Sequence, residues 1–470
     1  MRAGSYAVGA LSALAKLGYL SKVDVISAAS GGAYAAGWYI SQRATSDADD
    51  AELFLDCKDK PNCGVYQHHL ADHGKLVNRR RVAFALLTDT LMFPVNLLVN
   101  GVFGWHENTT GHRRFYERAL VSEFFTTPGT HRHIRYSFPD LGAASLSKHL
   151  PLLVVNTTVS IDDDSHHYAA DLRNSIYELS PVRYGSDAFG YSSDQYQMDL
   201  PRAISVSGAA ADLSVLASGN VQKTLFSALN LDLGYFIDNP MRFMRQSTDA
   251  SGCVKYTAVD NAHFNARKWT FRAVPFPVYP FIPYWSKDKQ GLRSYLSDGG
   301  HSENLAAFSL VRRLVRNIVI VDASGDANFL FDDYKQLQKA ILQHLNANFE
   351  VPAIEAALKA ETVDERRRII SAMPVMTGTV RYFPYPNEPN NERTLNIVYL
   401  KLSYDLAGEK TKYKDFPNIV AYRTKHAGVF PFQGLFDQAY SPDQYRAYRD
   451  LAYVSIVNDG QLIRSMAALP

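Results

Sequence analysis

One segment near the start of the chain, VDVISAASGGAYAAGWY at residues 23–39, constrains the fold most strongly. Val23, Val25 and Ile26 form a short β-branched run that predicts a buried strand. The run stops at Ser30, and the alanines and glycines that follow predict a helix packed closely on a sheet. A serine on such a turn projects its hydroxyl beside the N–H groups of the helix N-terminus. The segment therefore predicts either a presented nucleophile or an ordinary strand-to-helix connection of small residues.

The composition is that of a globular protein. The 470 residues include 46% apolar residues and have a formal net charge of +2, which gives no overall nucleic-acid-binding signature. No Pro/Gly/Ser-rich linker divides the chain, so one large domain with insertions, or two closely packed domains, is expected. The three cysteines cannot all pair with one another, which argues against a disulfide framework and favours a reducing compartment.

Residues 57–73 gather potential zinc ligands, namely Cys57, Cys63, His68, His69 and His73. Their spacing does not match a closed tetrahedral site. A surface loop, or a local disulfide between the two cysteines, is the favoured interpretation. We therefore predict no metal site.

The first residues predict an amphipathic helix rather than a signal peptide. Val8, Leu11, Leu14 and Leu17 share one face, and Gly18 is placed to end the helix. No basic segment followed by an apolar core is present, so the pattern is not that of a signal peptide.

Residues 82–105 form a long apolar segment. Asp89 and Asn96 interrupt it and Pro94 would kink it, so a membrane-spanning helix is not predicted. Two interpretations stay open for the segment. It is either a core helix or a membrane-contacting lid within a surface insertion at about 44–130.

Apolar strand patterns alternate with helical patterns along the rest of the chain. Strands are expected at 150–160, 268–274, 316–324 and 395–403, and helices at about 201–218, 303–315, 332–347 and 363–373. Continuous apolar strands between helices predict an α/β fold with a mostly parallel central sheet covered on both faces. Chemistry in such sheets gathers at the carboxyl ends of the strands, where Ser30 would lie.

A second strand-turn-helix pattern, YLSDGGHSENLAAFSLVRRLV at residues 295–315, ends its strand at Asp298. Gly299 and Gly300 would let the chain turn tightly there. A serine nucleophile needs a base, and a carboxylate at such a turn can supply one. Taken alone, an Asp-Gly-Gly sequence is more typical of a plain turn than of a catalytic site.

Together the two turns resemble the catalytic dyad of the patatin-like phospholipases and the related cytosolic phospholipase A catalytic domains. In that family the serine of G-x-S-x-G is activated directly by the aspartate of D-G-G or D-G-A, without histidine. AASGGA around Ser30 and SDGGHSENLA around Asp298 match these motifs, with Ala28 in place of the first glycine. Further similar segments lie at 155–160, 177–187, 200–213 and 430–452. The resemblance implies a single catalytic domain over residues 1–470, with a three-layer α/β/α fold and helical insertions.

The resemblance also implies a function. It indicates a lipid acyl hydrolase of the phospholipase A or lysophospholipase type, a serine hydrolase that forms an acyl-enzyme on Ser30 with Asp298 as base. Gly31 would supply an oxyanion N–H group. The substrate would be a phospholipid or another acyl lipid, met at a membrane surface by a cytoplasmic or peripheral protein, with no nucleic-acid partner and no cofactor. The small residues that would support the two turns are Gly32, Gly299 and Gly300.

The chain departs from this family at its start. The family opens with a strand and a G-G-G-x-R loop whose N–H groups form the oxyanion hole, and Met1 and Arg2 fall where x-R belongs. The resemblance therefore implies an N-terminally truncated domain in which Arg2 stands beside an incomplete oxyanion site. An absent strand would also leave a groove along Val23 to Ile26.

Two other functions remain open from the sequence. The order Ser30, Asp298, His426 is compatible with a Ser-His-Asp esterase triad. The departure at the oxyanion loop is compatible with a catalytically impaired membrane-binding or scaffolding relative.

Overall fold

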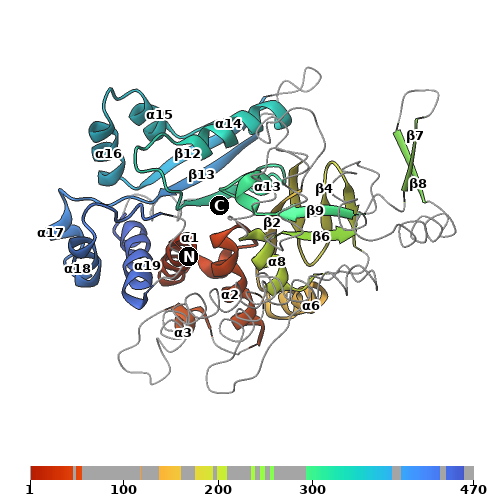
Figure 1. Ribbon diagram of the computed structural model, residues 1–470, viewed down its shortest axis with the longest axis horizontal. Coiled ribbons are helices and arrows are strands. Elements are labelled where there is room, and N and C mark those ends of the chain that lie inside the picture. Colours follow the sequence, from red (N-terminus) through yellow and green to blue (C-terminus); the bar gives the residue numbers. More distant parts are fainter. Residues whose placement is uncertain are drawn as a thin grey trace, which may run out of the picture.

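The computed structural model describes twelve stretches of the chain, namely residues 2–45, 49–54, 117, 137–159, 175–193, 198–208, 234–238, 244–248, 254–258, 293–383, 393–434 and 441–459. Figure 1 shows how the elements in these stretches are arranged. The cysteine and histidine cluster at 57–73 and the apolar segment at 82–105 lie outside them, as does most of the insertion expected at about 44–130.

A seven-stranded sheet carries Ser30 and Asp298 at two of its strand ends. Its path runs β5 (Gly190–Ser192), β4 (Tyr184–Ser186), β3 (Ile176–Leu179), β2 (Leu152–Val159), β9 (Arg293–Ser297) and β6 (Tyr235–Asp238), and β1 (Val25–Ala29) also pairs with β2. The face toward α2 (Gly31–Thr45), α6 (Phe138–Lys148) and α8 (Leu200–Ser207) is apolar. This packing confirms the strand-to-helix pattern predicted for residues 23–39.

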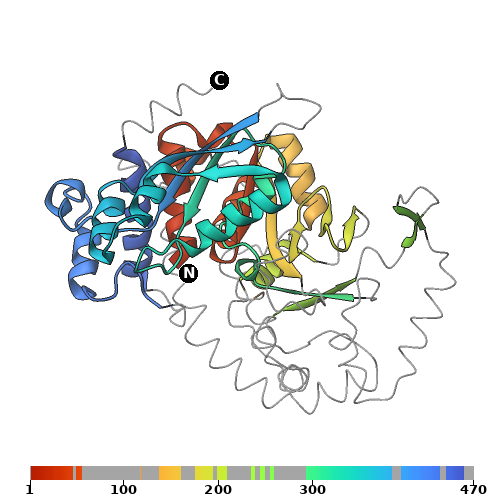
Figure 2. The ribbon, with the colours of Figure 1, turned by 90° about the horizontal axis from the view of Figure 1, so that it is seen from above.

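A four-stranded sheet in the order β10 (Asn317–Asp322), β13 (Arg393–Lys401), β12 (Val375–Tyr382) and β11 (Ala347–Glu350) lies between two helical layers. Ile318 and Ile320 of β10 join the core beneath α14 (Asp332–Leu345) and α15 (Pro352–Leu358). The alternate residues Val319 and Val321 pack toward α1 (Arg2–Lys16) and α19 (Pro442–Val457). Figure 2 shows this sheet with helices on both sides. The α/β class is therefore confirmed, and so are the strands expected at 150–160, 316–324 and 395–403.

The pairing within the sheets differs from the expected mostly parallel arrangement. Among the described strands, β1 with β2 and β10 with β13 are parallel, and the other ladders are antiparallel. Tight connections account for the hairpins β3–β4 and β4–β5, because strands joined by a few residues must pair antiparallel. Strands far apart in the sequence, such as β2 and β9, are antiparallel as well. The strand expected at 268–274 lies outside the described residues. The remaining elements are η1 (Leu20–Lys22), α3 (Asp50–Phe54), β7 (Met244–Thr248), β8 (Val254–Ala258), η5 (Gly299–His301), α13 (Phe308–Val311), α16 (Val363–Ala372), α17 (Glu409–Lys412) and α18 (Pro417–Lys425).

The predicted N-terminal helix is present as α1, and Gly9 fixes how closely it packs on α19. A Cβ at Gly9 would lie 1.9 Å from the carbonyl oxygen of Arg449. We expect Gly9→Ala to lower the free energy of unfolding by about 1–3 kcal/mol, because backbone cannot move aside as a flexible side chain can. Thermal unfolding measures this. Gly32→Ala is the control, since its Cβ would meet nothing closer than 4.0 Å, and an equal loss in both variants would contradict the packing argument.

Candidate active site

The strand register explains why Ser30 and Asp298 meet. β1 runs parallel to β2 and ends with Ala29 opposite Asn156. β9 runs antiparallel to β2 along the same edge and ends with Ser297 opposite Thr158. The carboxyl ends of β1 and β9 thus point toward each other along one edge of β2. Residues 30 and 298 follow these strand ends directly, although 268 positions separate them in the sequence.

The Ser30 turn has a strained backbone conformation. Ser30 has a φ of 49°, a left-handed conformation that is uncommon for residues other than glycine. Its N–H donates to Ser207 Oγ at 2.9 Å, and that hydroxyl donates to the carbonyl of Asn156 at 2.7 Å. Ala28, which replaces the first glycine of the motif, is not among the residues with positive φ. Its methyl group is therefore compatible with the turn.

Asp298 is oriented toward Ser30 by contacts on its other atoms. Ser30 Oγ donates to Asp298 Oδ2 at 3.0 Å. The second carboxylate oxygen accepts the N–H of Gly300 at 2.6 Å, and the main-chain carbonyl of Asp298 accepts the hydroxyl of Thr158 at 2.6 Å. The carboxylate is buried, with 2% of the residue exposed. One oxygen is thus held by the backbone while the other faces the serine hydroxyl.

Two of the predicted glycines are required by close approaches. A Cβ at Gly299 would lie 2.3 Å from the carbonyl oxygen of Asn156. A Cβ at Gly31 would lie 2.8 Å from the Cβ of Ala3 and 3.1 Å from the N atom of Gly4. Gly31 therefore lets the starts of α1 and α2 meet beside Ser30. The first N–H groups of a helix have no partner within it, so both helix ends offer donors and a positive dipole end here.

Arg2 lies at the start of α1 but binds main-chain carbonyls. Its Nε donates to the carbonyl of Ala323 at 3.0 Å, and its terminal NH1 donates to the carbonyl of Gln433 at 2.5 Å. The residue is 7% exposed. Arg2 thus ties α1 to the carboxyl end of β10 and to the loop before α19.

A cavity of about 720 Å³ opens beside Ser30 and Asp298. Its walls include β1 along its whole length on one side and β10 on the other, with α1 beside them. In the part of the chain that the structure describes, β1 pairs only with β2, and β10 only with β13. The groove expected along Val23 to Ile26 is therefore present, and it lies between two strand edges.

His426 does not join the pair. It ends α18, where its ring stacks on Tyr422 with centroids 4.2 Å apart. It is not among the described residues that line the cavity holding Ser30 and Asp298. The alternative Ser-His-Asp arrangement is thus not assembled in the described structure.

A buried acid, Glu303, lies five residues after Asp298 in the loop that leads to α13. Its carboxylate oxygens accept the N–H groups of Leu305 at 2.8 Å and Phe308 at 3.0 Å. Burial raises the pKa of Glu303 to about 7, and these N–H groups only partly oppose the rise. The native state therefore binds this proton more tightly than the unfolded chain does.

This proton should make stability depend on pH. The pKa of Glu303 is about 7 in the folded protein against 4.5 unfolded, so the contribution is complete below pH 4.5 and is lost as pH rises through 7. We expect the free energy of unfolding in urea to be higher at pH 5 than at pH 8, and this difference to be about 2–3 kcal/mol larger in the wild type than in Glu303→Gln. The exposed Glu361→Gln serves as control. Parallel pH profiles for wild type and Glu303→Gln would contradict this assignment.

Asn156, Thr158 and Ser207 are site residues that sequence reasoning did not single out. They fall within the 155–160 and 200–213 segments of the resemblance, but no spacing in the sequence links them to Ser30. The strand register alone brings them together. Asn156 also binds β1 through its side chain, which donates to Ser27 Oγ at 2.8 Å.

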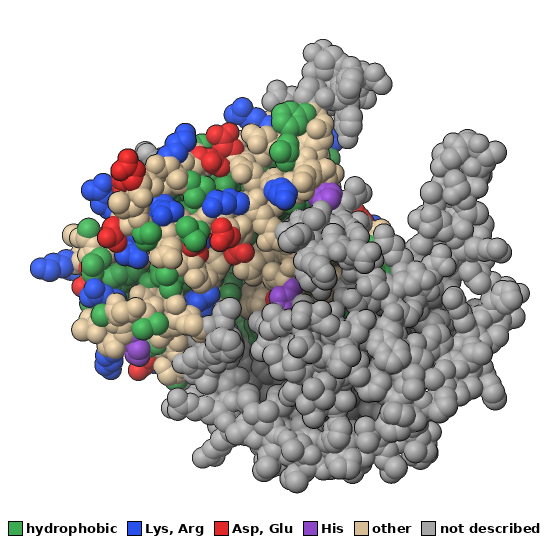
Figure 3. Space-filling view, turned by 45° about the horizontal axis from the view of Figure 1, so that its top comes forward, with side chains coloured by type: hydrophobic (Ala, Val, Ile, Leu, Met, Phe, Trp, Pro, Cys, Tyr) green, Lys and Arg blue, Asp and Glu red, His purple; other side chains and the backbone are tan. Residues whose placement is uncertain are grey.

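Neither a metal centre nor a membrane span is found in the described stretches. They contain no group of three or more His, Cys, Asp and Glu side chains placed to hold a metal ion. No helix among them is long and apolar enough to cross a bilayer. On the face shown in Figure 3, the acidic and basic side chains of the described part are interspersed.

The fold and site thus define an α/β protein with a serine and a carboxylate paired at two converging strand ends. No protein-family model matches the chain, and no curated protein matches it. It is similar to the solved structure of human GIVD cytosolic phospholipase A2, with a TM-score of 0.52 and 14% identity over 99% of this chain and 61% of that chain. The complex of that protein with methyl gamma-linolenyl fluorophosphonate gives 0.51 and 12%, over 99% and 57%. The chain thus spans about three-fifths of these structures, and the likeness shows the fold.

Proposed function

We propose that the protein hydrolyses acyl esters of lipids, with Ser30 as nucleophile and Asp298 as general base. The observation that carries this proposal is the 3.0 Å hydrogen bond from Ser30 Oγ to Asp298 Oδ2, made by a serine held at positive φ. Few structural roles require a strained serine aimed at a buried carboxylate, whereas a nucleophile and its base require this geometry. A serine hydrolase of the patatin-like type fits it.

The chemistry follows from the contacts of the pair. Asp298 accepts the Ser30 proton while the serine oxygen attacks the ester carbonyl, and the protonated carboxyl then gives that proton to the departing alcohol. Water attacks the acyl-enzyme with Asp298 again as base. The negative charge on the tetrahedral intermediate would lie near Gly31 N–H, where α1 and α2 begin.

The acyl lipid class is supported by the structural neighbour. That protein binds a linolenyl fluorophosphonate, a reagent that combines a lipid chain with an electrophile. The apolar cavity lined by Ala7, Leu11 and Ile26 does not by itself indicate a lipid, because the same groove fits a further strand. A phospholipase A or lysophospholipase acting at a membrane surface, as a cytoplasmic or peripheral protein, is the function most consistent with the neighbour's ligand.

The groove between β1 and β10 suggests that the competent site includes one more strand. Gly4 packs beside Gly31 after β1, and Arg2 binds Ala323 after β10, so the carboxyl ends of both strands meet at the start of α1. A strand parallel to them would satisfy the N–H and C=O groups along the groove, which an acyl chain could not do. Its last residues would lie near Ser30, where oxyanion donors are needed.

A fluorophosphonate probe with a fatty acyl chain tests the nucleophile. We expect mass spectrometry to find the phosphonate adduct on Ser30, and Ser30→Ala to lose it. Ser21→Ala, at an exposed serine, controls for general labelling. Adducts on other serines with none on Ser30 would refute the assignment of Ser30 as the nucleophile. Binding to lipid vesicles without any adduct would favour a scaffolding protein without catalytic activity.

A further inference from the structure

Asn156 contacts both turns of the candidate site through its backbone. Its carbonyl accepts the hydroxyl of Ser207, which in turn accepts the N–H of Ser30. The same carbonyl oxygen would lie only 2.3 Å from a Cβ at Gly299, the residue after Asp298. Its side-chain amide donates to Ser27 Oγ on β1 at 2.8 Å. One residue of β2 is thus hydrogen-bonded to the strand before Ser30 and lies close against the turn after Asp298.

A buried serine extends these contacts toward the second turn. Ser309 Oγ on α13 lies 2.9 Å from Asn156 Oδ1 and 2.5 Å from Glu178 Oε1. Ser309 belongs to the segment that continues from Asp298. The hydroxyl therefore joins the amide of Asn156 to the chain that carries the proposed base.

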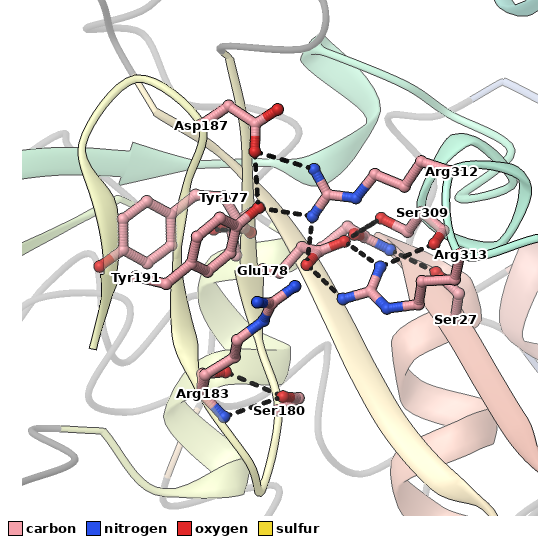
Figure 4. Close-up of polar contacts among 12 residues, drawn as sticks. Ser27, Tyr177, Glu178, Ser180, Arg183, Asp187, Tyr191, Ser309, Arg312 and Arg313 are labelled. Carbon is pink, nitrogen blue, oxygen red and sulfur yellow. Dashed lines mark hydrogen bonds and ion pairs between the residues drawn. The ribbon is translucent and has the colours of Figure 1, made fainter. Parts of the chain in front are cut away.

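Beyond Ser309 lies an ion cluster composed of Glu178, Arg312 and Arg313, shown in Figure 4. Arg313 places NH1 and NH2 at 2.7 and 2.6 Å from the two oxygens of Glu178, and Arg312 NH2 lies 2.5 Å from it. The Glu178 side chain is 1% exposed. Burial raises the pKa of Glu178, but the guanidinium groups and the Ser309 hydroxyl outweigh burial and hold it below the usual value.

Every member of this cluster has several partners. Arg312 also contacts Asp187 at 3.3 Å and the hydroxyl of Tyr191 at 2.5 Å, both from the β4–β5 region. Charges withdrawn from water are costly unless geometry and hydrogen bonds compensate fully. The proposed reaction uses none of these charges directly.

We propose that Asn156 is the positioning residue that sets the two catalytic turns against each other, and that the ion cluster, acting through Ser309, holds its side chain. This inference rests on the proposed function for its kinetic consequence. Its structural consequence stands apart from activity, because the same contacts should restrain the Ser30 and Asp298 turns whether or not an ester is cleaved.

Ser309→Ala tests the inference, since it removes one hydroxyl and leaves Asn156 and the ion pairs in place. Asn156→Ala is the stronger variant. We expect kcat and the rate constant for labelling of Ser30 by a fluorophosphonate to fall about 10- to 100-fold with KM unchanged, because small misplacements of reacting groups are costly. Amide hydrogen exchange should rise about tenfold or more in residues 29–32 and 298–301, while β12 and β13 stay protected.

Val380→Ala is the matched control, because it opens space in the core of the other sheet. It should lower stability without changing kcat or exchange at the two turns. The inference is overturned if Ser309→Ala and Asn156→Ala lose stability as Val380→Ala does but keep the wild-type rate and exchange. If the wild type is never labelled on Ser30, the proposed function fails, and the exchange measurement alone still decides the positioning role.

Discussion

Replacing Asp298 with asparagine is expected to lower ester hydrolysis by roughly 10²–10⁴-fold, the contribution of a well-placed general base. The amide is nearly the same size as the carboxylate and can still accept the N–H of Gly300 or the hydroxyl of Ser30, so the fold should be kept. It cannot take up the serine proton. Initial rates with a chromogenic short-chain ester, together with thermal unfolding, measure both effects.

Two variants serve as controls for Asp298→Asn. Ser30→Ala removes the proposed nucleophile and should lose at least as much activity. His426→Ala should keep wild-type turnover, because His426 stacks on Tyr422 and does not line the cavity. Retained turnover in Asp298→Asn, or loss in His426→Ala, would require a different base.

The pairing of Ser30 with Asp298 was predictable through the family resemblance of their two motifs, but the reason they meet was not. Each motif taken alone is a local signal for a strand, a turn and a helix. The meeting depends on β1 and β9 sharing one edge of β2 in opposite directions. That register is set by contacts between residues far apart in the chain. It also explains why the sequence did not identify Asn156 and Thr158 as site residues.

The helix expected over 303–315 shows a second limit of sequence reasoning. Its apolar spacing is helical, yet the structure has only the short α13. Ala306 has a φ of 55°, and the carboxylate of Glu303 binds the N–H groups of Leu305 and Phe308 before the helix starts. A buried side chain thus satisfies donors that a longer helix would have used, which periodicity does not reveal.

The mostly parallel sheet was a reasonable prediction from apolar strand runs, and it was wrong for a related reason. Strands buried on both faces look alike in sequence whether their neighbours run parallel or antiparallel. Val398 and Leu400 of β13 are buried beneath helices on one face, and Ile397 and Tyr399 on the other. Burial on two faces was therefore predicted correctly, whereas the relative direction of neighbouring strands cannot be read from that burial.

A strand supplied to the groove between β1 and β10 is expected to raise turnover by at least about 100-fold. We would extend the chain before Arg2 with an alternating β-branched strand ending in three glycines. The strand would pair with both edges, and each glycine N–H placed as an oxyanion donor contributes roughly 10²–10³ in rate. Turnover of a chromogenic ester, solubility and thermal unfolding would be compared with those of residues 1–470.

The glycines separate the chemistry of this extension from its packing. The same strand ending in three bulky β-branched residues should still fill the groove and raise the unfolding temperature. It should not raise turnover, because only glycine allows the close backbone approach that places the N–H donors at the oxyanion. If the groove instead holds the acyl chain of the substrate, either extension would block it and lower turnover. Full activity of residues 1–470, unchanged by both extensions, would mean that N–H groups already at the site, such as those at the start of α1 and α2, complete the oxyanion hole.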